Sequence, residues 1–213
     1  LDGTKLDKFA IPDAVSAEGL KQRFTRSEWR VAQVTKSEKK RYPAAPFTTS
    51  TLQQEAARKL GFSAKKTMST AQKLYEGVAI GAAGTVGLIT YMRTDSVNLS
   101  SQALAEAHDL ILRLFGSNYA LPKPRTFKNK AKNAQEAHEA IRPTDLTRTS
   151  AELKAFLPPD QFKLYELIWK RTVACQMKEA LLDQTSIDIE ATAGGLFRAT
   201  GSVMRFDGFM KLY

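Results

Sequence analysis

The fold of this chain is constrained most by segments in which apolar and polar residues alternate. They lie on both sides of a long central region. Residues 28–41 alternate apolar and polar side chains and end in a run of lysine and arginine. Residues 187–191 alternate in the same way, Gly194 and Gly195 suit a turn, and residues 196–203 repeat the pattern. Such period-two patterns predict β-strands. β-structure is therefore expected to flank the central region.

Helical periodicity dominates the centre of the chain. Helix starts are predicted at Thr48, Thr49 or Ser50, at Ser63, at Ser100 or Ser101, and after Pro158 and Pro159. The run Thr149–Glu152 also fits a capping box. The apolar stripe of the second helix places Met68, Ala71 and Tyr75 toward the core. The glycine-rich stretch 77–87 between these helices predicts a hairpin or loop.

The simplest architecture for this pattern is an α+β fold. A β-rich domain is interrupted by an inserted, mainly α-helical domain in the centre of the chain. The two β-rich parts then pair across the insertion. The chain begins without methionine and ends on strand-like residues 211–213, and we expect it to be a piece of a longer protein.

The composition of the chain narrows the classes of function that it can have. The 213 residues carry a net charge of +10, which makes nucleic acid the leading partner and an acidic membrane surface the second. With one cysteine, no intrachain disulfide can form, and two histidines add little to a zinc site. Cys175 is expected in the core. The sequence shows no apolar run long enough for a membrane span and no signal peptide.

The stretch from Leu88 to Ser96 carries the strongest chemical signal. An apolar run is expected to form a strand that ends at Tyr91, and Arg93 follows two residues later. A phenol is a weak nucleophile because its usual pKa is about 10. A nearby guanidinium favours the phenolate and can hold a phosphate under attack. Tyr91 is thus a candidate nucleophile, and the alternative is a buried tyrosine beside a salt bridge.

A second polar stretch runs from Gln135 to Pro143. If this stretch is helical, His138 and Arg142 project from the same side because they lie four residues apart. An imidazole and a guanidinium on one face suit a phosphate clamp. Neither stretch identifies a reaction by itself.

Together, these stretches resemble the type IA DNA topoisomerases, the bacterial topoisomerase I group. The resemblance rests on three runs in the family's order: Pro46–Glu55, Ile89–Ser96 and Gln135–Pro143. It spans nearly the whole chain, although the glycine-rich stretch and the lysine-rich loop align poorly. It implies a β-rich hinge domain at 1–46 and 179–213, and a tyrosine-bearing helical domain at 47–178.

The resemblance also implies roles for individual residues. Tyr91 would attack one DNA strand and form a 5′-phosphotyrosyl link, and Arg93 would stabilise charge on the scissile phosphate. His138 would lie near the active site, with a hydrogen-bonding role toward phosphate or an aspartate. Asp95 would orient neighbouring side chains, and Arg142 would contact DNA.

Thr49, Ser50 and Gln53 lie at an expected helix start, where hydroxyls and free backbone N–H groups can hold phosphate. An ordinary helix cap explains them equally well, so both interpretations stay open.

The metal-binding part of the family's active site is missing from this sequence. Members carry a Toprim domain whose acidic cluster holds Mg²⁺, and no Asp-x-Asp-x-Glu pattern occurs here. The scattered aspartates suggest no cation site, so no metal ligands are expected in the chain.

The parent enzyme would relax negatively supercoiled DNA in the bacterial cytoplasm, at the nucleoid, without ATP. We expect the isolated chain to be inactive without the Toprim domain.

A lysine-rich loop fits single-stranded DNA as the partner. Its five cations, with no acid among them, are Lys123, Arg125, Lys128, Lys130 and Lys132.

Three rival hypotheses remain. The chain is a non-catalytic single-stranded DNA-binding module, a phosphotransferase or recombinase that uses a tyrosine, or an interaction scaffold that does not depend on Tyr91.

Overall fold

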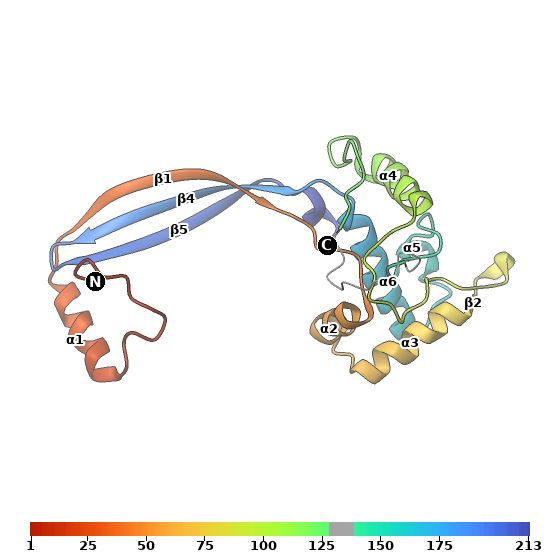
Figure 1. Cartoon of the computed structure of the whole chain (residues 1–213), viewed down its shortest axis with the longest axis horizontal. Helices are drawn as coiled ribbons and strands as arrows, with labels where there is room; N and C mark the ends of the chain where they lie inside the picture. Colours follow the sequence, from red (N-terminus) through yellow and green to blue (C-terminus); the bar gives the residue numbers. More distant parts are fainter. Residues whose placement is uncertain (128–138) are drawn as a thin grey trace. The chain divides into compact units, whose positions relative to one another are not determined.

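The computed structural model describes residues 1–127 and 139–213, which form two compact units (Figure 1). The strand unit consists of Leu1–Arg41 and Leu181–Phe206, and the helical unit consists of Tyr42–Ala180 and Asp207–Tyr213. The expectation of a mixed helix and sheet fold is confirmed.

The strand unit is built on a three-stranded sheet with the order β1-β4-β5. Its elements are α1 (Ala14–Thr25), β1 (Trp29–Arg41), β4 (Ala180–Ala191) and β5 (Gly195–Phe206). Strands β4 and β5 pair antiparallel through the predicted glycine turn. β1 lies beside β4, so the two parts of the sheet do pair across the intervening helices. The rings of Phe24, Trp29 and Phe197 cluster where α1 meets the sheet.

The helical unit holds the main hydrophobic core. Its elements are α2 (Thr49–Leu60), α3 (Ala64–Glu76), β2 (Val78–Ala79), η1 (Gly81–Ala83), β3 (Thr85–Val86), α4 (Ser101–Phe115), α5 (Ser150–Leu153), α6 (Pro159–Cys175) and η2 (Gly208–Lys211). Helix α6 contacts α2, α3, α4 and α5 (Figure 1). Its residues Leu164, Tyr165 and Ile168 are fully buried. Cys175 is buried as expected. None of the helices in the described ranges has the length and hydropathy to cross a membrane.

The predicted helix starts are confirmed by their capping hydrogen bonds. Thr48, Ser63 and Ser100 each accept a hydrogen bond from a backbone N–H in the first turn of α2, α3 and α4. Gly61 ends α2 with a φ of 68°, a left-handed conformation that glycine adopts without strain. The glycine-rich stretch forms the short β2–β3 hairpin. These local signals therefore place α2, α3 and α4 correctly.

Two local predictions in the helical unit are wrong. No strand leads into Tyr91, because Ile89 forms only an isolated β-bridge with Pro143. The expected helix over 135–142 is absent in its described part, residues 139–142, which is irregular and forms a bridge at Ile141. Both segments pair with distant parts of the chain, which the local pattern does not encode.

The end of the chain also differs from expectation. Lys211 ends the 3₁₀ helix η2, Leu212 is its C-cap and Tyr213 follows it, so residues 211–213 do not form a strand. Asp207–Tyr213 joins the helical unit, whereas the sequence-based division assigned 179–213 to the β-rich domain. The cause is visible in two contacts: Tyr119 Oη donates to Asp207 at 2.8 Å, and Phe209 N donates to Lys178 O at 2.9 Å.

Candidate functional site

The three runs noted in the sequence meet in the helical unit. The segment after Glu139 pairs with both of the others, because Ile141 forms an antiparallel bridge with Phe47 and Pro143 forms one with Ile89. Ile141 N donates to Phe47 O at 2.8 Å. The candidate site is thus assembled from segments that lie far apart in sequence.

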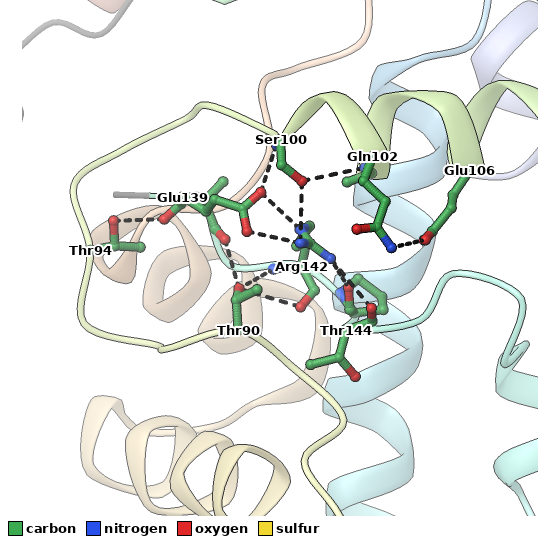
Figure 2. A network of polar contacts seen from close by, with 11 residues as sticks. Thr90, Thr94, Ser100, Gln102, Glu106, Glu139, Arg142 and Thr144 are labelled. Carbon is green, nitrogen blue, oxygen red and sulfur yellow. Dashed lines mark hydrogen bonds and ion pairs between the residues drawn. The ribbon is translucent and has the colours of Figure 1, made fainter. Parts of the chain in front are cut away.

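Threonines anchor the Tyr91 segment on both sides. Thr90 N donates to Arg142 O at 2.9 Å, and Thr90 Oγ1 donates to Ala140 O at 2.7 Å. Thr94 Oγ1 donates to Glu139 O at 2.9 Å (Figure 2). Each hydroxyl bonds the backbone of the segment after residue 138. The backbone that carries Tyr91 and Arg93 is therefore fixed at both ends.

Thr49, the first residue of α2, holds the same segment from another direction. Its Oγ1 donates to Met92 O at 2.8 Å and accepts from Thr94 N at 2.9 Å. Thr49 N donates to Thr94 O at 2.9 Å. These bonds bracket Arg93, so the structure uses the Thr49 hydroxyl to position the segment.

The other two predicted residues of α2 have different surroundings. Ser50 is exposed, and its Oγ accepts a hydrogen bond from Gln54 Nε2 at 2.9 Å. Gln53 is half-buried. The assignment of Thr49, Ser50 and Gln53 to DNA binding stays a prediction, and the Thr49 contacts favour a positioning role for that residue.

Exposure alternates along the anchored segment. Tyr91 is 50% exposed, and Arg93 and Asp95 are also exposed, whereas Met92 and Ser96 are buried at 1% and 0%. The phenol and the guanidinium are thus accessible to a large substrate while their backbone is fixed. A fixed nucleophile beside a cation suits attack on an anionic ester.

Arg142 is bound within the chain instead. Its Nε and Nη2 donate to the Glu139 carboxylate at 3.2 and 2.8 Å, and its Nη1 donates to Pro143 O at 2.8 Å (Figure 2). Ser100 N also donates to Glu139 Oε1 at 2.6 Å. The Arg142 side chain is only 13% exposed. These contacts favour a positioning role over a direct contact with DNA.

These surroundings shift the pKa of the Glu139 carboxyl group. Burial acts to raise its pKa, but hydrogen bonds from Arg142 and from the Ser100 backbone outweigh burial, so the pKa lies below its ordinary value. Glu139 is therefore held as a carboxylate that ties the start of α4 to the segment after residue 138. Sequence reasoning missed Glu139, because the i,i+3 pairing signal applies to helices and residues 139–142 are not helical.

Two further predictions depend on the residues around 128–138. His138 lies outside the described residues, as do Lys128, Lys130 and Lys132. Arg125 is described and donates from Nη1 to Cys175 O at 2.9 Å and Met177 O at 2.7 Å. Burial lowers the pKa of Arg125, partly opposed by Glu179, with which it forms a salt bridge. Arg125 is thus a structural residue.

Comparisons with known proteins settle the family. The family model described as DNA topoisomerase matches residues 2–213. The chain belongs to the type IA DNA topoisomerase family. It is similar to DNA topoisomerase 1 of Xylella fastidiosa strain Temecula1, with 51% identity over all of this chain and 26% of that protein. It is also similar to DNA topoisomerase 1 of Rickettsia felis, with 52% identity over 98% of this chain and 27% of that protein.

A solved structure supports the same assignment. Full-length topoisomerase I from Thermotoga maritima is 44% identical and gives a TM-score of 0.78, covering 92% of this chain and 31% of that chain. The topoisomerase chain described here therefore spans about a quarter of the length of the curated relatives it matches.

One aromatic contact in this topoisomerase site was not expected. The ring of Tyr75, at the end of α3, lies 5.2 Å from the ring of Tyr91 at an interplanar angle of 64°. Tyr75 was predicted to face the core, but it is 40% exposed. The apolar stripe of α3 reaches the core at Ala71 and Leu74 instead, and both are fully buried.

Proposed function

We propose that Tyr91 is the nucleophile of a topoisomerase reaction on one strand of DNA. The observation that carries the proposal is the anchored segment on which Tyr91 and Arg93 are exposed while Met92, between them, is buried. A structural tyrosine would not require exposure. Membership of the topoisomerase family supplies the substrate class.

The proposed step is a transesterification. Tyr91 Oη forms a bond to the phosphorus, the bond from phosphorus to the 3′-oxygen breaks, the phenol loses its proton, and the leaving oxygen gains one. The products are a 5′-phosphotyrosyl link and a free 3′-hydroxyl. Because one ester replaces another, the reverse reaction reseals the strand without ATP. Passage of the other strand between the two steps would relax negative supercoils.

Arg93 would bind the scissile phosphate in this reaction. Its guanidinium suits the negative charge that grows on the phosphoryl oxygens in the transition state. His138 and Asp95 are proposed as nearby positioning groups, and the net charge of +10 supports a single-stranded DNA segment as the partner.

The described residues of this chain do not fit the Mg²⁺ site that the family implies. Within 1–127 and 139–213, no group of three or more His, Cys, Asp or Glu side chains is placed to hold a metal ion. We propose that Mg²⁺ is bound by a Toprim domain elsewhere in the enzyme, and no step is assigned to it here. The relatives are bacterial, which supports action on the chromosome in the cytoplasm.

Trapping of a covalent DNA adduct tests this proposal. The purified chain is mixed with a single-stranded oligonucleotide labelled at its 3′ end, a separately produced Toprim domain from a family relative, and Mg²⁺. Label is expected to comigrate with the protein on a denaturing gel. Tyr91→Phe should abolish the adduct, and Tyr42→Phe, at a tyrosine that is 62% exposed, should not.

Two other outcomes are informative. An adduct that survives in Tyr91→Phe contradicts the assignment of the nucleophile. Retained DNA binding with no adduct in the wild-type chain supports the alternative function, a non-catalytic single-stranded DNA-binding module. The chain alone should not relax plasmid DNA with Mg²⁺, and relaxation would contradict its proposed dependence on the Toprim domain.

A further inference from the structure

We infer that Tyr75 forms a base-stacking subsite beside Tyr91, for a nucleobase of the DNA strand that Tyr91 attacks. The inference rests on the proposed function and deepens it, because it names a group that binds the nucleotide rather than its phosphate. Three observations carry it: the exposure of Tyr75, the geometry of its ring pair with Tyr91, and the contacts that tie α3 to the Tyr91 segment.

The exposure of Tyr75 is not explained by packing. Leu74, its neighbour on α3, is fully buried, while Tyr75 is 40% exposed. A tyrosine that only fills a core is expected to be buried, with its hydroxyl bonded inside. Tyr165 on α6 shows that arrangement, with 0% exposure and its Oη donating to Arg148 O at 2.7 Å.

The ring pair leaves aromatic surface open beside the nucleophile. Tyr75 and Tyr91 meet at 64° with a centroid separation of 5.2 Å, an edge-to-face arrangement. In that arrangement the edge of one ring covers the face of the other, so the two rings do not stack. With Tyr75 40% and Tyr91 50% exposed, aromatic surface remains available to a ligand.

The position of Tyr75 relative to Tyr91 is fixed by the backbone. Leu88 N donates to Leu74 O at 2.7 Å, which joins the end of α3 to the segment that leads into Tyr91. At Gly87, a Cβ atom would lie 2.6 Å from Tyr75 O, so glycine permits this close approach. A subsite held in place before binding loses little entropy when the ligand arrives.

Chemistry identifies the ligand as a base. The face of an aromatic ring carries partial negative charge and does not attract phosphate, which Arg93 suits instead. A nucleobase is one sugar away from the phosphate that Tyr91 attacks, and so comes within reach of the neighbouring ring. Stacking on an aromatic side chain accepts any base, so the subsite by itself requires no particular base.

Binding measurements with abasic oligonucleotides test this subsite. All proteins carry Tyr91→Phe, which keeps the ring and removes the nucleophile, so binding is measured without cleavage. Affinity for a fluorescent single-stranded oligonucleotide is measured at low salt, with a single abasic position moved along the strand. Tyr75→Leu is compared with Tyr75→Phe, and Tyr42→Leu is the control at another exposed tyrosine.

Tyr75→Leu should weaken binding of the intact strand by about 5- to 150-fold, and Tyr75→Phe should retain affinity. At one abasic position, Tyr75→Leu should cost nothing further, because the base it would stack on is already missing. Unchanged affinity in Tyr75→Leu, or an equal loss at every abasic position, overturns the inference. Matching circular dichroism and urea unfolding exclude misfolding as the cause.

These results are separable from those for the proposed function. Cleavage plays no part in the measurement, so a stacking subsite can be found even if no covalent adduct forms. Conversely, an adduct through Tyr91 together with a position-independent Tyr75→Leu effect rejects the subsite alone. Failure of every protein to bind single-stranded DNA overturns both proposals.

Discussion

Two arginines of the site, Arg93 and Arg142, differ in what their guanidinium groups already bind. Arg93 is exposed on the anchored segment, whereas Arg142 is 13% exposed and donates to Glu139, Pro143 and Ser100. The family resemblance implied a DNA or phosphate contact for both. The structure separates a group available to a substrate from a group that holds the site together, and mutation can test that separation.

The largest effect is expected at Arg93 and should be confined to catalysis. Arg93→Gln removes the charge proposed to stabilise the transition state, so the rate of adduct formation should fall by about 10²- to 10³-fold. The free energy of unfolding should change by less than about 0.5 kcal/mol, because the side chain is exposed. Adduct trapping and urea unfolding measure the two quantities. A large loss of stability in Arg93→Gln would contradict the proposed difference between Arg93 and Arg142.

Arg142→Gln should show the opposite pattern. It leaves the half-buried Glu139 carboxylate without its ion pair, so the free energy of unfolding should fall by about 2–3 kcal/mol. The double variant with Glu139→Gln should lose less than the sum of the two single variants, because both remove one interaction. Additive losses in urea unfolding would contradict the pairing described for these residues.

A smaller effect is expected at Thr49, whose hydroxyl bonds the backbone on both sides of Arg93. Thr49→Val leaves Met92 O and Thr94 N without that partner, at a cost of about 1–2 kcal/mol of stability. Adduct formation should slow, because the segment is held less firmly, and Thr49→Ser should restore the rate. Thr67→Val is the matched control, since that hydroxyl bonds only Ser63 O within the first turn of α3. An equal slowing in Thr67→Val would reject positioning by Thr49.

The smallest effect concerns the pH dependence of stability. The pKa of Glu139 is lowered in the folded chain, so its stabilising contribution is present above its ordinary value of 4.5 and is lost as the pH falls through the lowered value. The stability difference between wild type and Glu139→Gln should therefore shrink with acidification below pH 4.5. Urea unfolding across pH 3–7 tests this, and a constant difference would contradict it.

Local signals in the sequence were enough to place much of the fold. Caps at Thr48, Ser63 and Ser100 depend on a few neighbouring residues, and the β4–β5 hairpin depends on alternation around a glycine turn. Each of these is complete within a short window. The sequence-based interpretation therefore located α2, α3, α4 and α6 and the β4–β5 hairpin, whereas it did not predict α1.

The candidate site was predicted less completely, because its geometry depends on distant pairing. Arg142 looked like part of a helix with His138, yet its neighbour Ile141 bridges Phe47, and its own guanidinium closes on Glu139. Tyr75 followed the apolar stripe of α3 but lies at the surface against Tyr91. No pattern along the chain reports such contacts.

The anchoring of Thr90 sets an order of events during synthesis. Its hydrogen-bond partners Ala140 and Arg142 lie 50 and 52 residues further along the chain. A ribosome that adds about 5–20 residues per second needs roughly 3–10 s to reach them after Tyr91 has been made. During that interval Tyr91 is present but its backbone lacks these partners. A nascent topoisomerase therefore cannot hold Tyr91 in its final place until the third of its sequence runs has emerged.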